Sequence, residues 1–468
     1  MPEIEPKSAS GPGARPPLPR RRFLRAAGGA SLTAASASRV AGASMRLRVA
    51  LVGCGGRGRS VAAKMSAAEG VEYVSFCDVY DRQAASARDE LAGGKGRLEK
   101  DFRRVMEDRE VDAVHVATPD HWHALPAVAA VRAGKHVYVE KPLGHNVLEG
   151  KAMVRAASDA KSVFLTGMQH RSAPHLAEAA AIVRSGRLRD VHFVRVWNYA
   201  NLMPSGPGRT PDSDPPEGLD WDFYLGPAPW VPFNTMRFLR TYRFFYDYAG
   251  GWITDFGTHR FDTVHQIMGR DRPLSVAAAG GRFAVSGMGD QPDLLQATFE
   301  YPGFVLSYET CNTNSFGSMG RLTPGLPLHG ARAAENRPNG MAFYGSNGTL
   351  IADRLGYEVI PEQGAYGGSL GSGDAFVPSR LERMHRAGKE PSRLHAEHFV
   401  RCVRDGEPPR ADALTGHRSS LVAHLGNIAY RAGRKLLWDA DAEDFVNDAV
   451  ASRMLGRRAR KPWDGISL

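Results

Sequence analysis

Three side chains that can exchange protons follow the glycine pair Gly250-Gly251. Asp255 and His259 are four residues apart, and Asp262 comes three residues later. In a helix that begins after the glycines, side chains at these spacings share one face. A carboxylate beside an imidazole orients the ring and raises its basicity. The pattern therefore predicts a histidine general base, with Asp255 as the group that orients and tunes it.

A glycine-rich loop earlier in the chain has the residues needed to bind a dinucleotide. The apolar run Arg46–Val52 predicts a buried strand, Arg59–Glu69 predicts a helix, and between them lies Gly53-Cys54-Gly55-Gly56-Arg57-Gly58. Gly53 permits the tight turn, Gly55 lets the backbone approach a pyrophosphate, and Gly58 lets helix and strand pack closely. The free N–H groups of the helix N-terminus then face the anion.

Asp78 indicates which dinucleotide is bound. It ends the predicted strand Val71–Cys77, 20 residues after Gly58. At this place an acidic residue hydrogen-bonds the adenosine ribose hydroxyls, and its charge repels a 2′-phosphate. The sequence therefore predicts NAD, while Arg82 lies close enough in sequence to leave NADP open.

Two more strand–helix units complete the first domain. Val111–Ala117 and His136–Val139 predict strands, and Ala124–Ala133 predicts a helix between them. Such alternation predicts a parallel, doubly wound sheet with ligands at the carboxyl ends of its strands. His121 and His123 follow the first of these strands without a third ligand nearby, so no metal site is predicted.

Past Lys161 the alternation ends and strand-like runs dominate. These runs are Val163–Thr166, Val191–Tyr199, Leu294–Tyr301, Phe304–Glu309 and Ala342–Tyr344. Asn347-Gly348 is a hairpin signal, and His395–Leu437 is predicted to be helical with a break at Asp405–Pro409. Residues 315–340 and 360–392 lack clean periodicity, which predicts long loops near a cleft or subunit contact, or disorder.

These patterns predict two folded domains after an N-terminal segment of residues 1–45. Residues 46–165 form an α/β Rossmann domain with a doubly wound parallel sheet. Residues 166–468 form an α+β domain with a large, mostly antiparallel open sheet and C-terminal helices at 395–437.

Several motifs resemble those of the glucose–fructose oxidoreductase/inositol dehydrogenase (Gfo/Idh/MocA) family. Together they cover most of the chain after residue 45. The matching pieces are the glycine loop, Asp78, Thr118-Pro119 with His123, Gly134-Lys135-His136-Val137, Glu140-Lys141-Pro142, Trp221–Pro227, Gly250–His259 and Phe343–Leu350. The Glu-Lys-Pro motif and the Asp-x-Gly-x-His part of Gly250–His259 are more diagnostic than the glycine loop alone.

The resemblance implies an NAD(P)-dependent oxidoreductase that moves a hydride between the nicotinamide and a secondary hydroxyl of a sugar, amino sugar or cyclitol. His259 takes the hydroxyl proton, and Lys141 donates to the same oxygen and stabilises alkoxide charge. Pro142 aims the lysine, and the bond before it is typically cis in the family. The remaining residues that the resemblance places at the cofactor are Thr118, Pro119, His123 and Glu140.

The resemblance also implies a pocket for a polyhydroxylated substrate and a homodimer or homotetramer formed through the open sheet. Polar groups and aromatic faces suit such a substrate, although each candidate also fits a structural role. By position in the family pattern, the pocket residues are Gln169, Arg171, Asn198, Tyr246 and Trp252.

The first 45 residues resemble a twin-arginine export signal. Arg20–Arg25 contains paired arginines, a weakly apolar run Ala26–Val40 follows, and Ala41-Gly42-Ala43 resembles a cleavage site. The pattern predicts a partner in the twin-arginine machinery, a periplasmic or otherwise exported protein, and no stable membrane insertion after processing. A basic disordered tail is the alternative. Because free NAD is scarce outside the cytoplasm, export would require tightly bound cofactor.

Composition excludes other classes of protein. The net charge is +10, but the basic residues are scattered rather than gathered beside a reading motif, so no nucleic-acid partner is predicted. The four cysteines have no paired short spacing, which argues against a disulfide framework or structural zinc.

Three alternatives remain open from the sequence. A glycosidase of this kind uses NAD transiently, oxidising a sugar carbon, eliminating, and reducing it back. A second alternative is a dinucleotide-binding protein without catalysis. The third concerns only Asp255 and His259, whose spacing also fits an ion pair on a helix surface.

Overall fold

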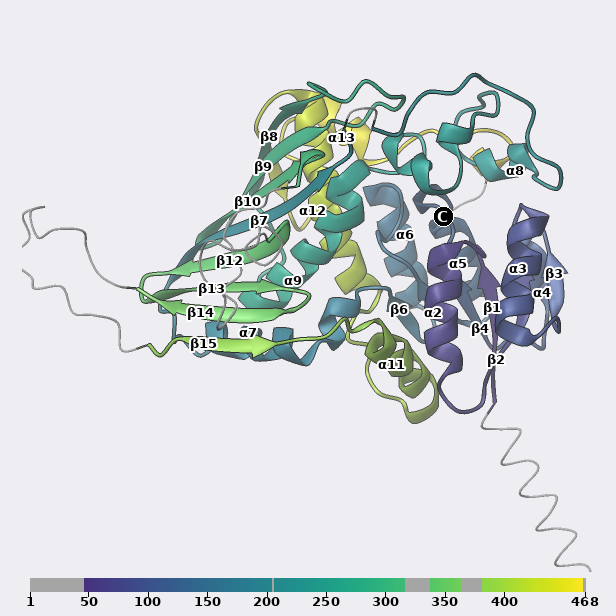
Figure 1. Cartoon of the computed structure of the whole chain (residues 1–468), viewed down its shortest axis with the longest axis horizontal. Coiled ribbons are helices and arrows are strands. Elements are labelled where there is room, and N and C mark those ends of the chain that lie inside the picture. Colours follow the sequence, from purple (N-terminus) through teal and green to yellow (C-terminus); the bar gives the residue numbers. More distant parts are fainter. Residues whose placement is uncertain (1–45, 204–205, 316–336, 363–380, 466–468) are drawn as a thin grey trace, which may run out of the picture. The chain divides into compact units, whose positions relative to one another are not determined.

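A parallel sheet lies between Leu47 and Thr166. A computed structural model describes residues 46–203, 206–315, 337–362 and 381–465. Within these ranges the sheet has six strands in the order β3-β2-β1-β4-β5-β6, all parallel (Figure 1). The strands are β1 (Leu47–Val52), β2 (Val71–Cys77), β3 (Arg97–Glu99), β4 (Ala113–Val116), β5 (His136–Val139) and β6 (Phe164–Thr166). The doubly wound Rossmann sheet predicted from the sequence is confirmed.

The crossover helices lie between these strands. They are α2 (Gly56–Ser66), α3 (Asp81–Ala92), α4 (Phe102–Glu107), α5 (Ala124–Arg132) and α6 (Val147–Ser158). Because parallel strands have helices on both faces, β1 and β4 consist almost entirely of buried aliphatic residues. The carboxyl ends of β1, β2, β4 and β5 therefore meet along one edge, where ligands bind in such sheets.

A second, larger sheet occupies the rest of the described chain. Its main path runs β15-β14-β13-β12-β7-β10-β9-β8-β16-β17, and β11 pairs with β7. Among the pairings of the described strands in this second sheet, only that of β7 with β10 is parallel. The strands are β7 (Val191–Asn201), β8 (Ser275–Gly281), β9 (Leu294–Tyr301), β10 (Phe304–Cys311), β11 (Thr313–Asn314), β12 (Asn339–Gly345), β13 (Gly348–Asp353), β14 (Gly356–Pro361), β15 (Met384–Ala387), β16 (Leu436–Asp439) and β17 (Asp444–Phe445). The mostly antiparallel sheet is thus confirmed.

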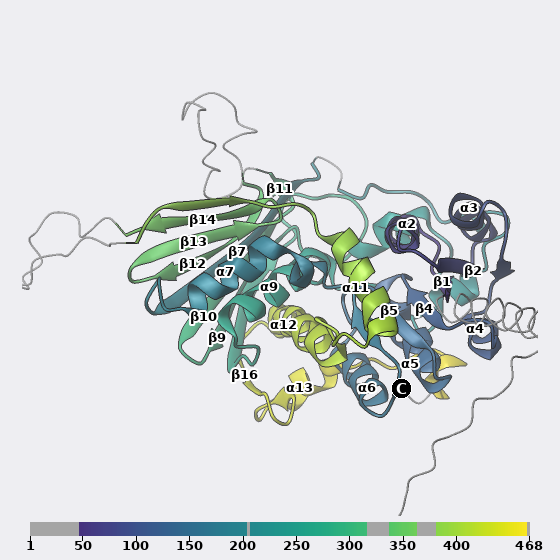
Figure 2. The same ribbon diagram turned by 90° about the horizontal axis from the view of Figure 1, so that it is seen from below.

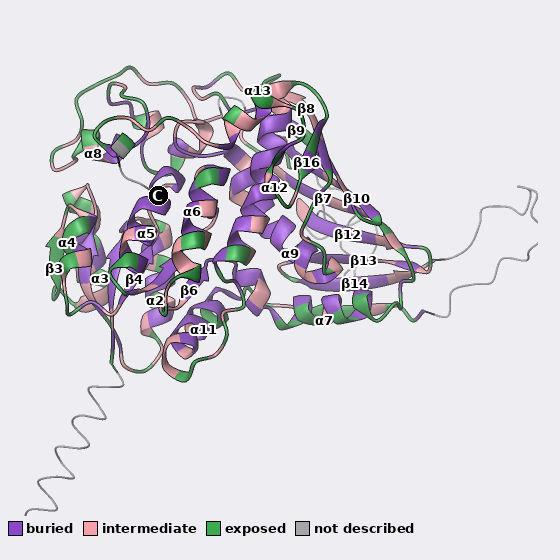
Figure 3. Ribbon diagram, turned by 180° about the vertical axis from the view of Figure 1, so that it is seen from behind, coloured by how far each residue is buried: buried purple, intermediate pink, exposed green. Residues whose placement is uncertain are grey.

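Helices cover one face of this second sheet. They are α7 (Pro174–Arg184), α9 (Thr258–Met268) and α12 (Ala413–Ala432), which Figure 2 shows against the strands. Alternate residues of β9, such as Leu295 and Phe299, point into the shared core with Phe261 of α9 and Leu425 of α12. Buried positions accordingly run along α9 and α12 (Figure 3). This packing fixes α9, the helix that carries His259.

The chain returns to the first sheet late in its course. Ala396 and Phe399 of α11 (Ser392–Asp405) belong to the core formed with α2 and β1. Trp463 packs edge-on against Trp122, with ring centroids 4.8 Å apart. A single boundary near residue 165 therefore does not describe every segment that packs on the Rossmann sheet.

The predicted helical stretch His395–Leu437 ends earlier than expected. α12 stops at Ala432 because Gly433 adopts a left-handed conformation, and Leu436–Asp439 forms the strand β16. The hairpin predicted at Asn347-Gly348 is present between β12 and β13. Much of the predicted loops 315–340 and 360–392 lies outside the described residues, as does the predicted export signal. In the described part of the chain, no helix is long and apolar enough to cross a membrane.

Candidate active site

A cavity of about 1230 Å³ opens along the carboxyl edge of the parallel sheet. Residues that directly follow β1, β2, β4 and β5 line it, and so do Trp252, Asp255 and His259 from the second half of the chain. The volume exceeds the roughly 300–1,000 Å³ of an ordinary small-ligand pocket. The cavity therefore has room for a cofactor and a substrate. We call the part at the glycine loop, Asp78 and Thr118 the nucleotide end, and the part at Lys141, Asp255, His259 and Arg354 the base end.

The glycine loop is shaped for a pyrophosphate. A Cβ on Gly53, whose φ is +92°, would lie 2.5 Å from the carbonyl carbon of Ala117, and one on Gly58 would lie 2.2 Å from the oxygen of Gly53. A Cβ on Gly55 or Gly56 would meet nothing within 4 Å. Gly55 is the N-cap of α2 and has no side chain that could bond the first N–H groups of the helix. These N–H groups therefore remain available to an anion. The loop thus fits the dinucleotide expected from the sequence.

Asp78 lies at the end of β2 and lines the nucleotide end. Its carboxylate accepts the N–H groups of Cys54 at 2.8 Å and Tyr80 at 2.9 Å, which fixes its orientation beside the loop. Burial raises the pKa of Asp78 to about 6, despite these hydrogen bonds. Both carboxylate oxygens of Asp78 keep further lone pairs, so they can also accept hydrogen bonds from ribose hydroxyls.

The arginine near Asp78 is not the one suggested by the sequence. Arg82 is exposed and does not line the cavity, whereas Arg59 does. Arg59 is bound by Glu90 at 3.1 Å, by Gln83 and by the oxygen of Cys54. The expected influence of Arg82 on NADP binding is therefore not supported by the structure, and Arg59 already has partners.

The loop after β4 carries the predicted Thr118, Pro119 and His123, and all three line the cavity. The Thr118 hydroxyl is buried and has no partner among the residues that the structure describes. The ring nitrogens of His123 lie 2.7 Å from the oxygen of Pro142 and 3.0 Å from that of Thr118, so the ring joins two cavity loops. His121 is bonded to Tyr224 instead, and no group of three or more potential metal ligands occurs among the described residues.

Glu140 ties the glycine loop to the strand end that presents Lys141. Its carboxylate is buried and accepts from Arg57 Nε at 2.8 Å. A Cβ on Gly167 would lie 3.0 Å from this carboxylate, so the glycine leaves space for it. Glu140 and Arg57 thus position the loop and the lysine relative to each other, and both side chains line the cavity.

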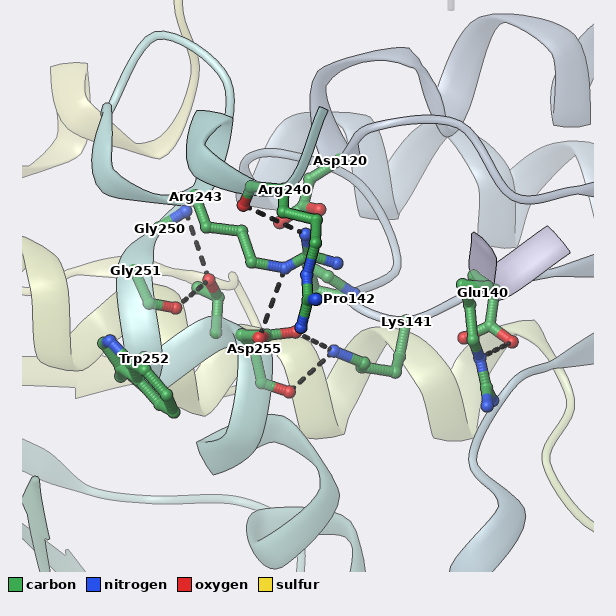
Figure 4. A network of polar contacts seen from close by, with 12 residues as sticks. Asp120, Glu140, Lys141, Pro142, Arg240, Arg243, Gly250, Gly251, Trp252 and Asp255 are labelled. Atoms are coloured by element: carbon green, nitrogen blue, oxygen red, sulfur yellow. Dashed lines mark hydrogen bonds and ion pairs between the residues drawn. The ribbon is translucent and has the colours of Figure 1, made fainter. Parts of the chain in front are cut away.

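Lys141 and Asp255 form the central pair of the base end (Figure 4). Lys141 Nζ donates to Asp255 Oδ1 at 2.5 Å and to the main-chain oxygen of Asp255 at 2.6 Å. Arg243 Nε lies 3.3 Å from the other carboxylate oxygen. Burial by itself would raise the pKa of Asp255, but Lys141 and Arg243 outweigh it and hold that pKa well below its usual range. An ammonium has three donors, so one N–H of Lys141 remains for a substrate oxygen. The bond between Lys141 and Pro142 is cis, as the resemblance implies.

His259 differs from the sequence prediction in its electrostatics. It is buried, its ring stacks on His170 at 5.1 Å, and neither ring nitrogen has a hydrogen-bond partner among the described residues. Burial, and then the charges of Lys141 and Arg354, keep the pKa of His259 well below 6.5. The expectation that Asp255 raises the basicity of His259 is wrong, because the carboxylate is bound to Lys141 and Arg243. Asp255 lies in the one-turn π-helix η5 (Ile253–Gly257), whereas His259 lies in the α-helix α9. The two side chains therefore do not share the face of one regular α-helix.

Asp262 does not face the cavity. It is fully buried and accepts from Arg171 Nε at 2.7 Å and from the hydroxyl of Ser419 at 3.0 Å. The predicted shared face of Asp255, His259 and Asp262 is therefore wrong for Asp262, and Arg171 is its ion-pair partner rather than a cavity residue.

Two other predicted substrate residues also lie away from the cavity. Asn198 on β7 donates to the hydroxyl of Tyr308, at 3.4 Å. Tyr246 packs beneath the guanidinium of Arg431, 5.2 Å from its ring centroid. Neither side chain lines the cavity, and each contacts another residue of the surrounding protein.

Gln169 and Trp252 are the predicted substrate residues that do line the cavity. The side-chain oxygen of Gln169 is buried and has no partner in the described part of the chain. Trp252 stacks on Phe256 with centroids 4.7 Å apart, which holds its ring rigidly at the wall. One polar acceptor and one fixed aromatic face are thus available to a ligand.

Among the cavity residues that sequence reasoning missed are three arginines. Arg243 comes from the 3₁₀ segment η4 (Leu239–Phe244), Arg354 from the turn between β13 and β14, and Arg240 precedes Arg243 by three residues. Figure 4 shows the side chains of Arg240 and Arg243 extending toward the Lys141–Asp255 pair. None of the three belongs to a motif or a periodic pattern, so the sequence offers no signal for them.

Comparisons with known proteins agree with this geometry. Residues 47–168 match the model of an oxidoreductase family with an NAD-binding Rossmann fold, and residues 196–282 and 377–465 match the C-terminal alpha/beta domain of an oxidoreductase family. The chain is 31% identical to levoglucosan dehydrogenase of Pseudarthrobacter phenanthrenivorans over 369 residues, 72% of this chain and 84% of that protein. It is 23% identical to myo-inositol 2-dehydrogenase of Thermotoga maritima over 389 residues, 82% of this chain and 96% of that protein. A solved levoglucosan dehydrogenase, in complex with NADH and levoglucosan, shares the fold with a TM-score of 0.60 and 19% identity, covering 83% of this chain and 98% of that one.

Proposed function

The chain belongs to the Gfo/Idh/MocA family of NAD-binding oxidoreductases, and we propose that it moves a hydride between NAD and a secondary hydroxyl of a sugar, an amino sugar or a cyclitol. The observation that carries the proposal is the pair of groups at the base end. A neutral imidazole whose ring nitrogens have no partner among the described residues lines the same cavity as the pyrophosphate loop, and so does a lysine with one spare donor.

The two side chains divide the proton chemistry between them. His259 takes the hydroxyl proton of the substrate, because its depressed pKa keeps the ring neutral and able to accept it. Lys141 donates to the same oxygen and stabilises the negative charge that develops there. Asp255 holds the ammonium in place through two contacts and stays ionised between Lys141 and Arg243. When bound, the nicotinamide supplies the carbon that accepts the hydride.

Two observations favour a polyhydroxylated substrate. The relatives named above are dehydrogenases of levoglucosan and myo-inositol. In this chain, Gln169 offers a buried, unpartnered acceptor to a hydroxyl, and the fixed ring of Trp252 offers a face for sugar C–H groups.

The cofactor is proposed to stay bound through successive turnovers. The twin-arginine pattern at Arg20–Arg25 favours export of the folded protein to the periplasm, where a dissociable cofactor would be lost. A second substrate would then return the cofactor to its starting redox state within the same site.

The protein is also proposed to form a homodimer or homotetramer through its second sheet. The face opposite the covering helices carries a stacked pair of Phe193 and Tyr344, with centroids 5.2 Å apart, and the guanidinium of Arg195 over Trp197. Light scattering of the purified protein tests this, and a monomer at micromolar concentration would contradict it.

The test of the function begins with the mature protein purified without added nucleotide. Denaturation should release stoichiometric NAD or NADH, identified by chromatography and absorbance. The intact protein is then offered sugars, amino sugars and cyclitols while the nicotinamide absorbance is followed. Substrate-dependent reduction supports a dehydrogenase. Release of an aglycone without net change in the redox state of the cofactor would instead identify the glycosidase alternative, and an empty protein that binds NAD weakly would contradict the tight cofactor.

A further inference from the structure

Arg354 is a cavity residue that the proposed proton chemistry does not use. It lies in the turn between β13 and β14 and lines the base end together with His259 and Gln169. Burial lowers the pKa of Arg354, yet a guanidinium remains a cation at neutral pH. A partly buried cation therefore lies beside the proposed base.

A hydrogen-bonded chain holds this arginine in place. Arg354 Nε donates to His170 Nε2 at 3.0 Å, and because a guanidinium can only donate, that nitrogen must be the acceptor. His170 Nδ1 then carries the hydrogen and donates to the hydroxyl of Thr263 at 2.9 Å, which in turn donates to the oxygen of His259. Arg354 is thus fixed through Nε while its two terminal nitrogens remain unused.

No carboxylate among the described residues neutralises Arg354 at ion-pair distance. Glu390 also lines the cavity, and its charge opposes the lowering of the Arg354 pKa by burial, but it is not within ion-pair distance and its oxygens accept the hydroxyl and the N–H of Ser392. Asp255 is shared between Lys141 and Arg243. The terminal N–H groups of Arg354 therefore have no acceptor within the described protein and stay accessible from the cavity.

The anionic groups of the dinucleotide do not supply that acceptor. The pyrophosphate is expected at the glycine loop, and the extra phosphate of NADP would lie beside Asp78. Burial and then the charge of the glycine-loop residue Arg57 lower the pKa of Arg354, but its bond to His170, whose ring stacks on His259, places it at the base end. A molecule that reacts at His259 would therefore meet the free N–H donors of Arg354.

We propose that the substrate is an acidic sugar, whose carboxylate is bound by the terminal nitrogens of Arg354 while a neighbouring hydroxyl reaches Lys141 and His259. The planar guanidinium presents parallel N–H donors that match a carboxylate, and such bidentate pairs are stronger than bonds between neutral groups. This inference rests on the proposed oxidoreductase function and narrows its substrate class to uronic-acid-like compounds.

The experiment measures binding of matched sugars by calorimetry to the full chain saturated with NADH. The probes are glucuronate and galacturonate, their neutral parents glucose and galactose, and glucose 6-phosphate. The variants are Arg354→Gln, Arg354→Lys and, as a control, Arg109→Gln, which removes one charge from an exposed residue outside the cavity. Melting temperature and NADH affinity are measured for each variant.

At least one of the two acids should bind roughly 10- to 100-fold more tightly than its neutral parent, as expected for charge-assisted hydrogen bonds in a partly buried site. Arg354→Gln should remove this preference, and Arg109→Gln should keep it. Arg354→Lys retains the charge without the planar fork and should restore only part of the preference. If Arg354→Gln is too unstable to measure, the size of the acid preference in Arg354→Lys tests the proposal.

The inference is overturned if acids and parents bind alike, if neither acid binds to protein that holds NADH, or if the preference survives in Arg354→Gln or is undiminished in Arg354→Lys. Tighter binding of glucose 6-phosphate than of both acids would also contradict a carboxylate site. These outcomes are separate from a failure of the proposed function. A neutral sugar oxidised with dependence on Lys141 would leave the function standing without the acid preference, whereas acids that bind without reducing the cofactor would leave Arg354 as a binding residue and remove the reaction.

Discussion

The two ends of the cavity are built from different groups. At the nucleotide end, the contacts come chiefly from backbone: glycines that make room, the first N–H groups of α2, and one carboxylate fixed by two main-chain donors. At the base end, they come from charged side chains on four separate elements. Lys141 follows β5, Asp255 lies in η5, Arg243 in η4 and Arg354 in a hairpin turn.

The difference indicates how each end responds to mutation. A backbone site depends on space, so an added methyl group should act sterically and leave charge unchanged. A side-chain site depends on balanced charges, so removing one group changes the pKa and the orientation of its neighbours. Changes at the nucleotide end should therefore alter cofactor affinity, and changes at the base end should alter the rate of hydride transfer.

The largest effect is expected from His259→Gln at the base end. Loss of the proton acceptor should lower kcat by roughly two to four orders of magnitude, with NAD affinity nearly unchanged. His192→Gln, an exposed position on β7, serves as the control and should leave kcat unaffected. A His259→Gln enzyme with near-normal kcat would show that His259 does not take the substrate proton, and would contradict the different roles assigned to the two ends.

The pH profile sharpens the same assignment. The pKa of His259 lies well below its ordinary value of 6.5, so the ring stays neutral as the pH falls from 7 toward 6. Activity should be kept over that interval and lost only at lower pH, when the ring gains its proton. An acid limb centred at or above pH 6.5 in kcat/KM would contradict the depressed pKa.

A smaller, steric effect is expected at the nucleotide end. In Gly58→Ala, the new methyl group meets the oxygen of Gly53 and should lower the free energy of unfolding by about 1–3 kcal/mol. In Gly55→Ala it meets no protein atom, so stability should change by no more than about 0.5 kcal/mol. NAD affinity should nevertheless fall roughly tenfold, because the methyl group occupies space needed by the pyrophosphate. Calorimetric melting and NAD titration measure both quantities, and unchanged NAD affinity in Gly55→Ala would place the pyrophosphate elsewhere.

The smallest effect concerns the choice between NAD and NADP. With a pKa of about 6, Asp78 is charged above pH 6 and repels a 2′-phosphate, but is neutral below it. The ratio of the NADP to the NAD dissociation constant should therefore fall several-fold as the pH is lowered from about 8 to about 5. The 2′-phosphate itself titrates near pH 6. The Asp78→Asn variant therefore shows how much of the change in the ratio comes from the phosphate alone. Equal changes in the wild type and in Asp78→Asn would show that Asp78 does not control the selectivity.

Much of the nucleotide end could be predicted from sequence because its parts are local. The strand, the glycine loop and the helix are consecutive, and Asp78 ends the next strand, so spacing alone brings them together. The base end was predicted only in part. Lys141 and His259 were identified through family motifs, but the partner of Asp255 is 114 residues away in sequence and depends on how the two sheets pack.

The errors have the same physical origin. Helical spacing placed Asp255 and His259 in one segment, but it could not show that Lys141 and Arg243 bind the carboxylate of Asp255. Three predicted pocket residues contact groups outside the cavity: Arg171 binds Asp262, Asn198 binds Tyr308, and Tyr246 packs on Arg431. The sequence does not show whether a polar side chain faces the cavity or the surrounding protein. Arg354 was missed because a turn residue carries no periodic signal.

The most direct test of the account is a single-turnover measurement on Lys141→Ala loaded with NAD. The account predicts that this variant binds NAD within about threefold of the wild type but reduces it roughly 100-fold or more slowly, because alkoxide charge is no longer stabilised. Lys95→Ala, at an exposed residue outside the cavity, should match the wild type in both. Equal rates of nicotinamide reduction in Lys141→Ala and wild type, at equal NAD occupancy, would show that the chemistry takes place without the base end described here.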